Sequence, residues 1–188
     1  MGLAARYGTL HLKGGDEMNE PILFREVQRP RQIWIWVIIL FIAAINWYGF
    51  IQQILFGIPF GNKPAPDFLL IIFWLVFGIL FPLCLCFFMK LITEVRQDGV
   101  YIRFMPFHSK YQRIPFTDIE KYTAITFKPI AQFGGIGIRV NLQGETAYIM
   151  SGNEGIKVHQ TNQKVIVIGS QRPNELIEAL HAGKRMKQ

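Results

Sequence analysis

The sequence has few residues of the kinds that build metal sites and disulfides. Only two cysteines are present, Cys84 and Cys86, two positions apart in an apolar run. Residues two apart on a helix point in different directions, and no cluster of histidine or cysteine stands nearby. This pair therefore predicts neither a metal site nor a structural disulfide. We expect two buried, inert thiols and no cofactor.

A recognisable set of catalytic side chains is also missing. By pattern, His108, His159 and His181 fall in a loop, a strand and the last helix, and nothing in their spacing unites them. Asp118 and Glu120 are expected in a surface turn. Because catalysis needs a nucleophile, a base and an orienting group in one arrangement, we predict that the protein is not an enzyme.

One segment looks at first like a phosphate-binding loop. The sequence FGGIGIRV, residues 133–140, has three glycines within four positions and then an arginine. A phosphate loop joins a strand to a helix whose amino end faces the phosphate. Here the following IRVNLQGETAYIM has the pattern of strands broken by a turn. We therefore expect the glycines to allow a bulge or a sharp strand bend, and no nucleotide to bind.

The start of the chain leaves two interpretations open. No apolar core follows the early basic residues, so the sequence predicts no secretory signal. Residues 13–17, KGGDE, can be encoded by a purine-rich string that resembles a ribosome-binding sequence ahead of the Met18 codon. Either the chain is prokaryotic and translation begins at Met18, or it begins at Met1 and carries a disordered tail.

Two long uncharged runs follow. They are IWIWVIILFIAAINWYGFIQQILF, residues 33–56, and FLLIIFWLVFGILFPLCLCFFM, residues 68–89. A helix of the first run's 24 residues is about 36 Å long, which exceeds a hydrocarbon core of about 30 Å. Trp34 and Trp47 fit interfacial aromatic belts, and Pro82 is tolerated in a span, where it would kink the helix. We predict two transmembrane helices.

The two helices are predicted to form a hairpin, because only GIPFGNKPAPD separates them. The turn has one basic residue, Lys63, whereas several lie at the outer ends of the runs: Arg25, Arg29, Arg31, Lys90 and Arg96. The positive-inside rule then gives a multi-pass protein of the inner (cytoplasmic) cell membrane with both termini in the cytoplasm. The spans contain no charged group, so we expect an anchor and no pore.

From residue 91 onward the hydrophobic pattern alternates with a period of two. The Asp98-Gly99 pair between two alternating runs is a strong hairpin signal. Further strands are predicted, which brings the count to about eight in fewer than 80 residues: 111–116, 121–127, 136–142, 146–150, 156–160 and 164–168. Short strands at this spacing favour an antiparallel barrel or sandwich.

A short amphipathic helix is predicted in SQRPNELIEALHAGK. Pro173 suits the first turn, Glu175 complements the positive end of the helix, and Gly183 is expected to stop it. Its apolar stripe should cover the open end of the barrel and consists of Leu176, Ile177 and Leu180.

The order of these motifs resembles a known group of proteins. VRQDGVYIRFMPFHSKYQRIPFTDIEKYTAITFKP, then GGIGIR, AYIMSGNEGIKV and VIVIGSQRPNELIEAL, resemble the prokaryotic membrane proteins with a bacterial pleckstrin-homology-like (PH-like) domain behind a helical hairpin, an uncharacterised family. The resemblance covers residues 88–182 and implies a seven-stranded bent barrel capped by a carboxy-terminal helix. It implies no lipid specificity, because Arg96 and Arg103 only flank a turn that carries Asp98.

The predicted fold class is an α+β membrane protein, with a transmembrane hairpin followed by an antiparallel PH-like barrel or sandwich and a capping helix. The predicted parts are an amino-terminal cytoplasmic segment at 1–31, the hairpin at 32–89, the PH-like domain at 90–183 and a basic tail at 184–188.

The cytoplasmic part is basic. Residues 90–188 contain 14 Lys and Arg against eight Asp and Glu, a net charge of +6. This charge fits a solvated surface or attraction to anionic lipids of the inner leaflet. Because the charges are scattered and form no stripe with aromatic residues, we predict that nucleic acid is not a partner.

We hypothesise that the domain is a protein- or lipid-interaction module whose partners are the bilayer, its anionic lipids, other membrane proteins or a second copy. An alternative is an accessory subunit of a membrane transport or envelope-maintenance complex. The candidate ligand contacts lie beside the glycine segment, at the start of the last helix and in the polar turn SGNEG: Arg139, Arg172, Ser151 and Asn153.

Overall fold

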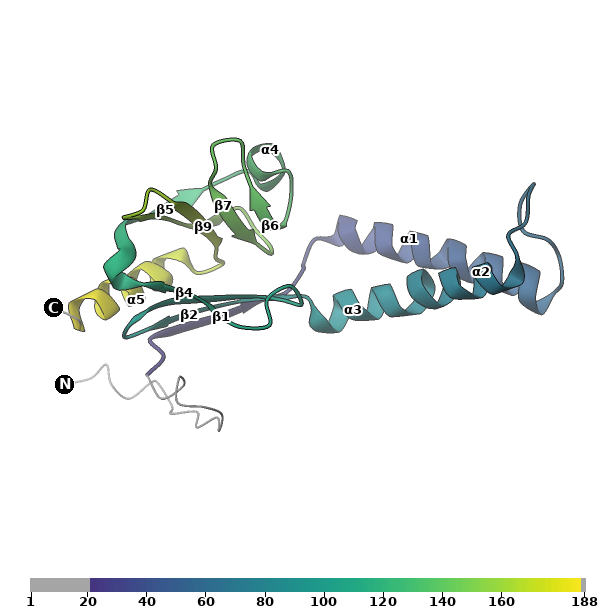
Figure 1. Ribbon diagram of the computed structural model, residues 1–188, viewed down its shortest axis with the longest axis horizontal. Helices are drawn as coiled ribbons and strands as arrows, with labels where there is room; N and C mark the ends of the chain where they lie inside the picture. The colour runs from purple at the N-terminus through teal and green to yellow at the C-terminus, as the bar shows by residue number, and fades with distance from the viewer. Residues whose placement is uncertain (1–20, 187–188) are drawn as a thin grey trace. The chain divides into compact units, whose positions relative to one another are not determined.

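The computed structural model describes residues 21–186, and the two candidate starts, Met1 and Met18, lie outside this range. The chain divides into two compact units. One is the hairpin, Arg31–Met89; the other, here called the module, combines the flanking parts Met1–Pro30 and Lys90–Gln188 (Figure 1). The hairpin is therefore inserted into the chain of the module.

The hairpin consists of two long apolar helices. The first comprises α1 (Ile33–Phe50) and the π-helical segment η1 (Ile51–Leu55). The second comprises α2 (Asp67–Phe73), the π-helical segment η2 (Trp74–Leu80) and α3 (Phe81–Phe88). Both are long and apolar enough to cross a membrane, with mean hydropathies of 2.0 and 2.8. The predicted helical hairpin is thus present.

A hydrogen bond between the two helices uses a backbone carbonyl that precedes a proline. Pro82 has no N–H, so it cannot bind the carbonyl of Gly78, four residues earlier. That carbonyl accepts a hydrogen bond from Trp47 Nε1 at 3.2 Å. The rings of Phe50 and Trp74 stack beside it with centroids 4.1 Å apart. The position of the proline therefore favours both the π-helical segment before it and a cross-helix hydrogen bond.

The cysteines differ from expectation. Cys84 and Cys86 are free thiols, and both are exposed on α3. The prediction of buried thiols was wrong because α3 buries none of its residues.

Sheet A of the module has four antiparallel strands in the order β1-β2-β3-β4. They are β1 (Phe24–Gln28), β2 (Lys90–Arg96), β3 (Gly99–Met105) and β4 (Gln112–Pro115). Arg96 pairs with Gly99, which confirms the predicted hairpin but places Gln97 and Asp98 in its turn and Gly99 in β3. No strand was predicted before the hairpin. β1 was missed because its partner β2 lies more than 60 residues away in the chain.

Sheet B has five strands in the order β5-β8-β9-β7-β6. Their bounds are β5 (Ile119–Thr126), β6 (Gly137–Val140), β7 (Thr146–Ile149), β8 (Glu154–Gln160) and β9 (Val165–Gly169). β7 and β9 pair in parallel, so the all-antiparallel prediction was wrong. β9 lies between β7 and β8, an order that alternation along one strand does not encode. The described strands form two sheets and no closed barrel, which corrects the barrel alternative.

The glycine segment ends a helix that the sequence analysis missed. α4 (Pro129–Phe133) stops at Gly134, which has the left-handed φ of +71° and donates its N–H to Ile130 O at 2.9 Å. The glycine is therefore a helix cap. The expected bulge was wrong because Pro129 begins a helix directly before the glycines.

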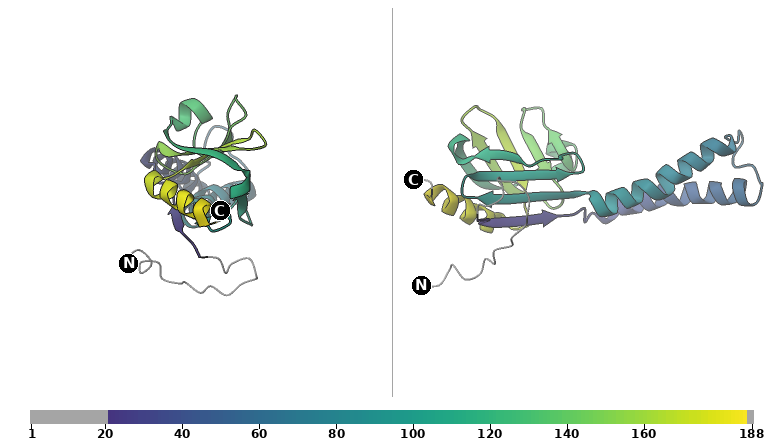
Figure 2. Two further views of the ribbon diagram at one scale, coloured as in Figure 1. Left: turned by 90° about the vertical axis from the view of Figure 1, so that its left-hand side faces the viewer. Right: turned by 60° about the horizontal axis from the view of Figure 1, so that its bottom comes forward.

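Helix α5 (Pro173–Met186) confirms the predicted last helix and packs against strands of both sheets, β1 and β2 of sheet A and β5 and β8 of sheet B (Figure 2). It does not stop at Gly183, so positions 184–186 are helical and not a tail. A Cβ at Gly183 would lie 2.6 Å from the ring of Phe116. Position 183 is therefore a glycine because it packs closely against Phe116, and not because it ends the helix.

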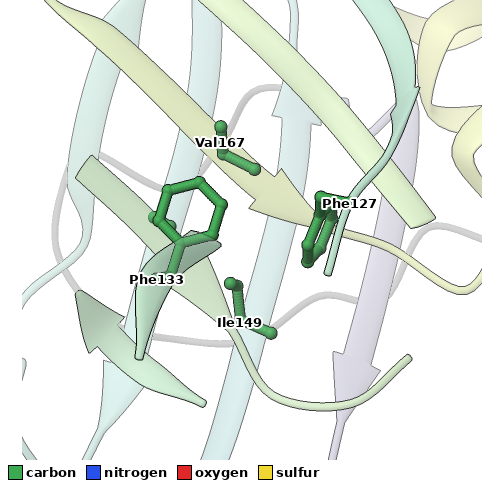
Figure 3. Close-up of a cluster of buried hydrophobic side chains, with 5 residues drawn as sticks. Phe127, Phe133, Ile149 and Val167 are labelled. Carbon is green, nitrogen blue, oxygen red and sulfur yellow. The ribbon is translucent and has the colours of Figure 1, made fainter. Parts of the chain in front are cut away.

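The core of the module consists of fully buried apolar side chains from both sheets and α5. Leu91, Val95 and Phe104 of sheet A and Leu176 and Leu180 of α5 are 0% exposed. In sheet B a second cluster is shown in Figure 3 and consists of Phe127, Phe133, Ala147, Ile149 and Val167. Phe133 reaches this cluster from α4, which fixes the short helix on the sheet.

Candidate functional site

The outer face of sheet A carries a row of charged and aromatic side chains. The strand register aligns Arg25 with Glu94, Glu94 with Tyr101 and Tyr101 with Arg113 across the four strands. Cross-strand partners share a face of the sheet, so four strands contribute one side chain each to this row. We call this surface the arginine–tyrosine face and define it by Arg25, Glu94, Arg96, Asp98, Tyr101, Arg103, Tyr111 and Arg113.

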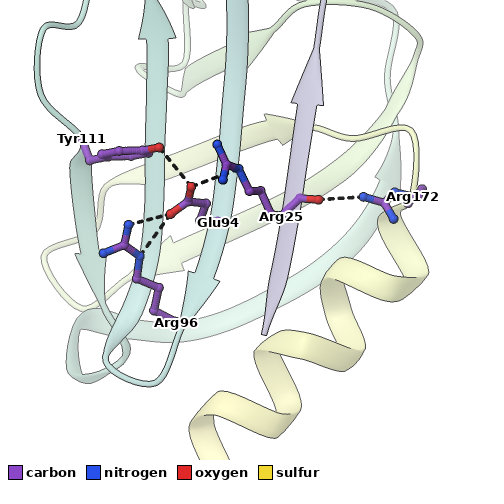
Figure 4. Close-up of polar contacts among 5 residues, drawn as sticks. All are labelled: Arg25, Glu94, Arg96, Tyr111 and Arg172. Atoms are coloured by element: carbon purple, nitrogen blue, oxygen red, sulfur yellow. Dashed lines mark hydrogen bonds and ion pairs between the residues drawn. The ribbon is translucent and has the colours of Figure 1, made fainter. Parts of the chain in front are cut away.

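Glu94 is the centre of the face (Figure 4). Its carboxylate accepts hydrogen bonds from Arg96 at 2.7 and 3.1 Å and from the Tyr111 hydroxyl at 3.0 Å. Arg25 adds an ion pair at 3.4 Å. The side chain of Glu94 is 2% exposed, and such a buried carboxylate is stable only when it is paired and hydrogen-bonded. The three partners therefore stabilise the charge of Glu94, and Glu94 fixes the positions of their side chains.

Aromatic rings orient the arginines of the face. The Arg96 guanidinium lies 4.4 Å from the ring centroid of Tyr101 and 5.6 Å from that of Tyr111. The Arg103 guanidinium also lies 5.6 Å from the ring centroid of Tyr111. Stacking of a planar guanidinium on a ring fixes the plane of the guanidinium.

Asp98, in the β2–β3 turn, closes the other end of the row. It accepts a hydrogen bond from the Tyr101 hydroxyl at 2.7 Å and forms an ion pair with Arg113 at 2.7 Å. Burial, together with the hydrogen bond to Asp98, raises the pKa of Tyr101 to about 12. Burial and the neighbouring Glu94 raise the pKa of Tyr111 as well. Both phenols are therefore neutral hydrogen-bond donors at physiological pH.

The face has a surplus of positive charge. Four arginines stand against two carboxylates, and the side chains of Arg25 and Arg113 remain 41% and 49% exposed. The exposed guanidinium groups of Arg25 and Arg113 suit carboxylate, phosphate or sulfate groups of a partner. The face supplies positive charge in a fixed orientation, which suits an anionic group.

A second polar cluster ties β1 to the connection between β9 and α5. Glu26 accepts hydrogen bonds from the Ser170 hydroxyl at 2.6 Å and from Gln171 N at 2.8 Å. Gln28 donates to Gly169 O at 2.7 Å. Both Glu26 and Gln28 are buried, so the strand that precedes the hairpin is fastened to the far end of the module's chain.

Two of the predicted contact residues belong to this cluster. Arg172 donates to Arg25 O at 2.8 Å and pairs with Glu175 at 3.0 Å (Figure 4). Ser151 is 4% exposed and accepts a hydrogen bond from Gln171 Nε2 at 2.8 Å. The structure thus brings Ser151 and Arg172 together through the β9–α5 connection, in positions that hold the fold.

The other two predicted contacts lie elsewhere. Asn153 is exposed in its turn, and its carbonyl accepts Phe127 N at 2.8 Å. Arg139 is exposed on β6, where Nε donates to Ile136 O at 2.9 Å. The four residues therefore do not form one site.

A groove of about 530 Å³ lies between α4 and the β6–β7 turn. Apolar side chains line it, among them Ile125 and Val167 of sheet B and Phe133 of α4. Its polar wall includes Glu145 and Lys157, which pair at 2.6 Å. Burial would raise the pKa of Glu145, but hydrogen bonds from Lys157 and Asn141 outweigh it and lower the pKa. This ion pair closes the polar wall.

Residues 21–186 contain no group of three or more His, Cys, Asp or Glu side chains placed to hold a metal ion. The sequence analysis missed Arg25, Glu94 and Tyr111 of the arginine–tyrosine face. The Asp98-Gly99 pair predicts the hairpin but not its register: with Gln97 and Asp98 as the turn residues Glu94 lies opposite Tyr101, whereas a turn of Asp98 and Gly99 would place it opposite Arg103.

Comparison with known proteins identifies a family. A family model described as a family of unknown function, DUF6141, matches residues 16–184, and the chain belongs to this family. Searches of curated proteins and of solved structures gave no match.

Proposed function

We propose that this DUF6141 protein is an integral membrane protein with two spans, whose module is a cytoplasmic PH-like domain that serves as a protein- or lipid-interaction module. The observation that carries the proposal is the insertion of an apolar hairpin between β1 and β2, two adjacent strands of one sheet. Four residues separate β1 from α1, and one separates α3 from β2. Linkers this short tether a folded module on both sides.

The surface of the hairpin supports the membrane part of the proposal. Phe41 and Phe68 are 65% and 71% exposed, and neither helix has a charged residue between Ile33 and Leu55 or between Phe68 and Phe88. Soluble proteins rarely expose continuous apolar surface of this length, whereas lipid accepts it. The basic residues on the module side of the hairpin favour a cytoplasmic module.

The architecture of the module supports the PH-like part. Two sheets and a carboxy-terminal helix that contacts both support a fold of this kind, although the described strands form no closed barrel. The parallel β7–β9 pair and the strand β1 from before the hairpin depart from the arrangement that the sequence resemblance implies. The arginine–tyrosine face supplies the interaction surface of this proposal.

Membrane extraction and labelling test the anchor and its orientation. In a Cys84→Ser, Cys86→Ser background, single substitutions Lys63→Cys in the turn and Glu178→Cys on α5 report the two sides. We expect the protein to stay in the membrane at alkaline pH, and a membrane-impermeant thiol reagent on intact cells to label only the Lys63→Cys variant. Release from the membrane, or outside labelling of Glu178→Cys, would contradict the proposal.

Crosslinking in native membranes tests the interaction surface. We expect Arg113→Gln to reduce crosslinks from the module to anionic lipid or protein, because it removes an exposed guanidinium of the face. Lys164→Gln, which removes another exposed cation outside the face, is the matched control. Stable crosslinks to one large membrane complex would instead favour the role of accessory subunit. Equal crosslinking by all three proteins would remove the face from the proposal.

A further inference from the structure

Three large apolar side chains stand exposed on two neighbouring segments of the module. Ile130 of α4 is 70% exposed, Val140 at the end of β6 is 66% exposed, and Leu142 in the β6–β7 turn is 102% exposed. Leu142 lines the groove together with residues 131–133 of α4, so Ile130 and Leu142 lie on neighbouring segments, and Val140 is two residues before Leu142. We call these three residues the apolar tip. None of these side chains adds to the core.

The turn that carries Leu142 is held in one conformation. Asn141 Oδ1 accepts hydrogen bonds from Gln143 N at 3.0 Å and Glu145 N at 2.9 Å. Gly144 has a φ of +80°, which a glycine adopts without strain. Glu145 is bound by Asn141 Nδ2 at 2.8 Å and by Lys157. The backbone and polar side chains thus define the turn, and the leucine is not needed to form it.

The exposed charged residues in the segment that carries the apolar tip, positions 128–145, are both basic. Between positions 128 and 145 the charged residues are Lys128, Arg139 and Glu145. Lys128 and Arg139 are exposed, whereas Glu145 is neutralised by its ion pair with Lys157. Exposed aliphatic side chains beside exposed cations match the chemistry of an anionic bilayer surface, in which the side chains reach the acyl boundary and the cations stay among the headgroups.

We propose that the apolar tip inserts into the headgroup–acyl boundary of the anionic leaflet that faces the module. The proposal rests on the proposed membrane anchor, since the short linkers on both sides of the hairpin keep the module at the bilayer. Leu142 and Ile130 supply the apolar contact, and Lys128 and Arg139 supply the attraction to anionic headgroups. The tip thereby adds a third membrane contact to the two helices and orients the module.

Fluorescence quenching in nanodiscs tests the insertion on the full chain. The protein in the Cys84→Ser, Cys86→Ser background receives an environment-sensitive fluorophore through Gln143→Cys, which leaves Leu142 in place. The nanodiscs contain phosphatidylglycerol and brominated phosphatidylcholine, whose acyl chains quench an inserted fluorophore. The same fluorophore attached through Glu178→Cys is the matched control on α5.

We expect quenching at position 143 but not at position 178, and less quenching at high salt. Adding Leu142→Asp to the position 143 reporter should lower the ratio of inserted to free tip by at least about tenfold, the effect of withdrawing a leucine side chain from an apolar environment. Leu142→Ser should lower it in the same direction. An unchanged protease-resistant module in both variants shows that they still fold.

The remaining outcomes separate the two proposals. A protein that stays in the nanodisc but shows no lipid quenching at position 143 overturns the insertion of the tip and leaves the anchor intact. Protection of that position from a soluble quencher without lipid quenching overturns it too, because a protein surface then covers the tip. A chain that is not retained in nanodiscs overturns the anchor itself.

Discussion

The hairpin and the module use the same apolar residue types in opposite ways. In the hairpin Phe41 is 65% exposed and Leu40 is 61% exposed, whereas in the module Phe104 and Leu180 are 0% exposed. The module therefore completes its own core from its two sheets and α5. The hairpin leaves much of its apolar surface exposed, and the difference shows that composition alone does not decide which part buries its own apolar side chains.

Polar side chains also bind differently in the two regions. In the hairpin Asn46 donates to Ile42 O of its own helix at 2.8 Å and Trp47 Nε1 donates to Gly78 O of the other helix at 3.2 Å, so both bind backbone carbonyls. In the module Glu94 and Glu26 bind groups from distant parts of the chain. Buried polar networks of this kind specify one arrangement of strands, and their partners cannot be removed singly without cost.

The largest expected effect is on the centre of the arginine–tyrosine face. Glu94→Ala leaves the buried Arg96 without its carboxylate, and loss of one partner of a buried pair costs about 3–5 kcal/mol of stability. Pulse proteolysis of the full chain in detergent measures the free energy of unfolding of the module. Glu120→Ala, at an exposed acid on β5, is the control and should change it by less than about 0.5 kcal/mol. A similar small change for Glu94→Ala would mean that this network does not stabilise the module.

The next effect compares two leucines directly. Leu180→Ala empties a fully buried site beneath α5 and should destabilise the module by about 2–5 kcal/mol. Leu40→Ala, at an exposed position of α1, should leave the same measurement unchanged because its side chain is outside the module. Equal responses at the two positions would contradict the division of the chain into two units.

Much of the fold could be predicted from local patterns. The two uncharged runs, the Asp98-Gly99 hairpin and the Pro173 helix start each depend on neighbouring residues, and the structure contains all three elements. The parallel pairing of β7 with β9 and the pairing of β1 with β2 depend on contacts between distant segments. Alternation fixes which side chains share a face but not which strands are neighbours, so these pairings were missed.

The hairpin and the module can be compared at two apolar residues of similar exposure. Phe41 in the hairpin and Met186 on α5 are 65% and 60% exposed. If the hairpin lies in lipid, Phe41→Asp should cost about 3 kcal/mol in insertion and reduce the protein retained in membranes. Met186→Asp, in water, should change stability by less than about 0.5 kcal/mol. Normal retention of the Phe41→Asp variant would show that this surface does not face lipid.

The candidate site was less predictable than the fold, for a physical reason. Arg172 and Arg139 were chosen as basic residues near turns, but the first binds a backbone carbonyl and a carboxylate and the second binds the carbonyl of Ile136. The arginine–tyrosine face arises only when β1 joins β2 and brings Arg25 beside Glu94. A site assembled across a pairing of distant segments has no local signal in the sequence.

The smallest expected effect concerns the protonation of Tyr101. It tests whether the polar groups of the module depend on one another. Because the pKa of Tyr101 is raised to about 12 from an ordinary 10.0, the folded module favours the neutral phenol. The resulting stabilisation is fully present below pH 10 and is lost as the pH rises from about 10 to 12, since the unfolded chain ionises first. Ultraviolet titration of wild type against Tyr101→Phe should assign one phenol near pH 12. Asp98→Asn should move that transition to lower pH, because the carboxylate disfavours the phenolate; a transition that stays in place would assign the shift to burial alone.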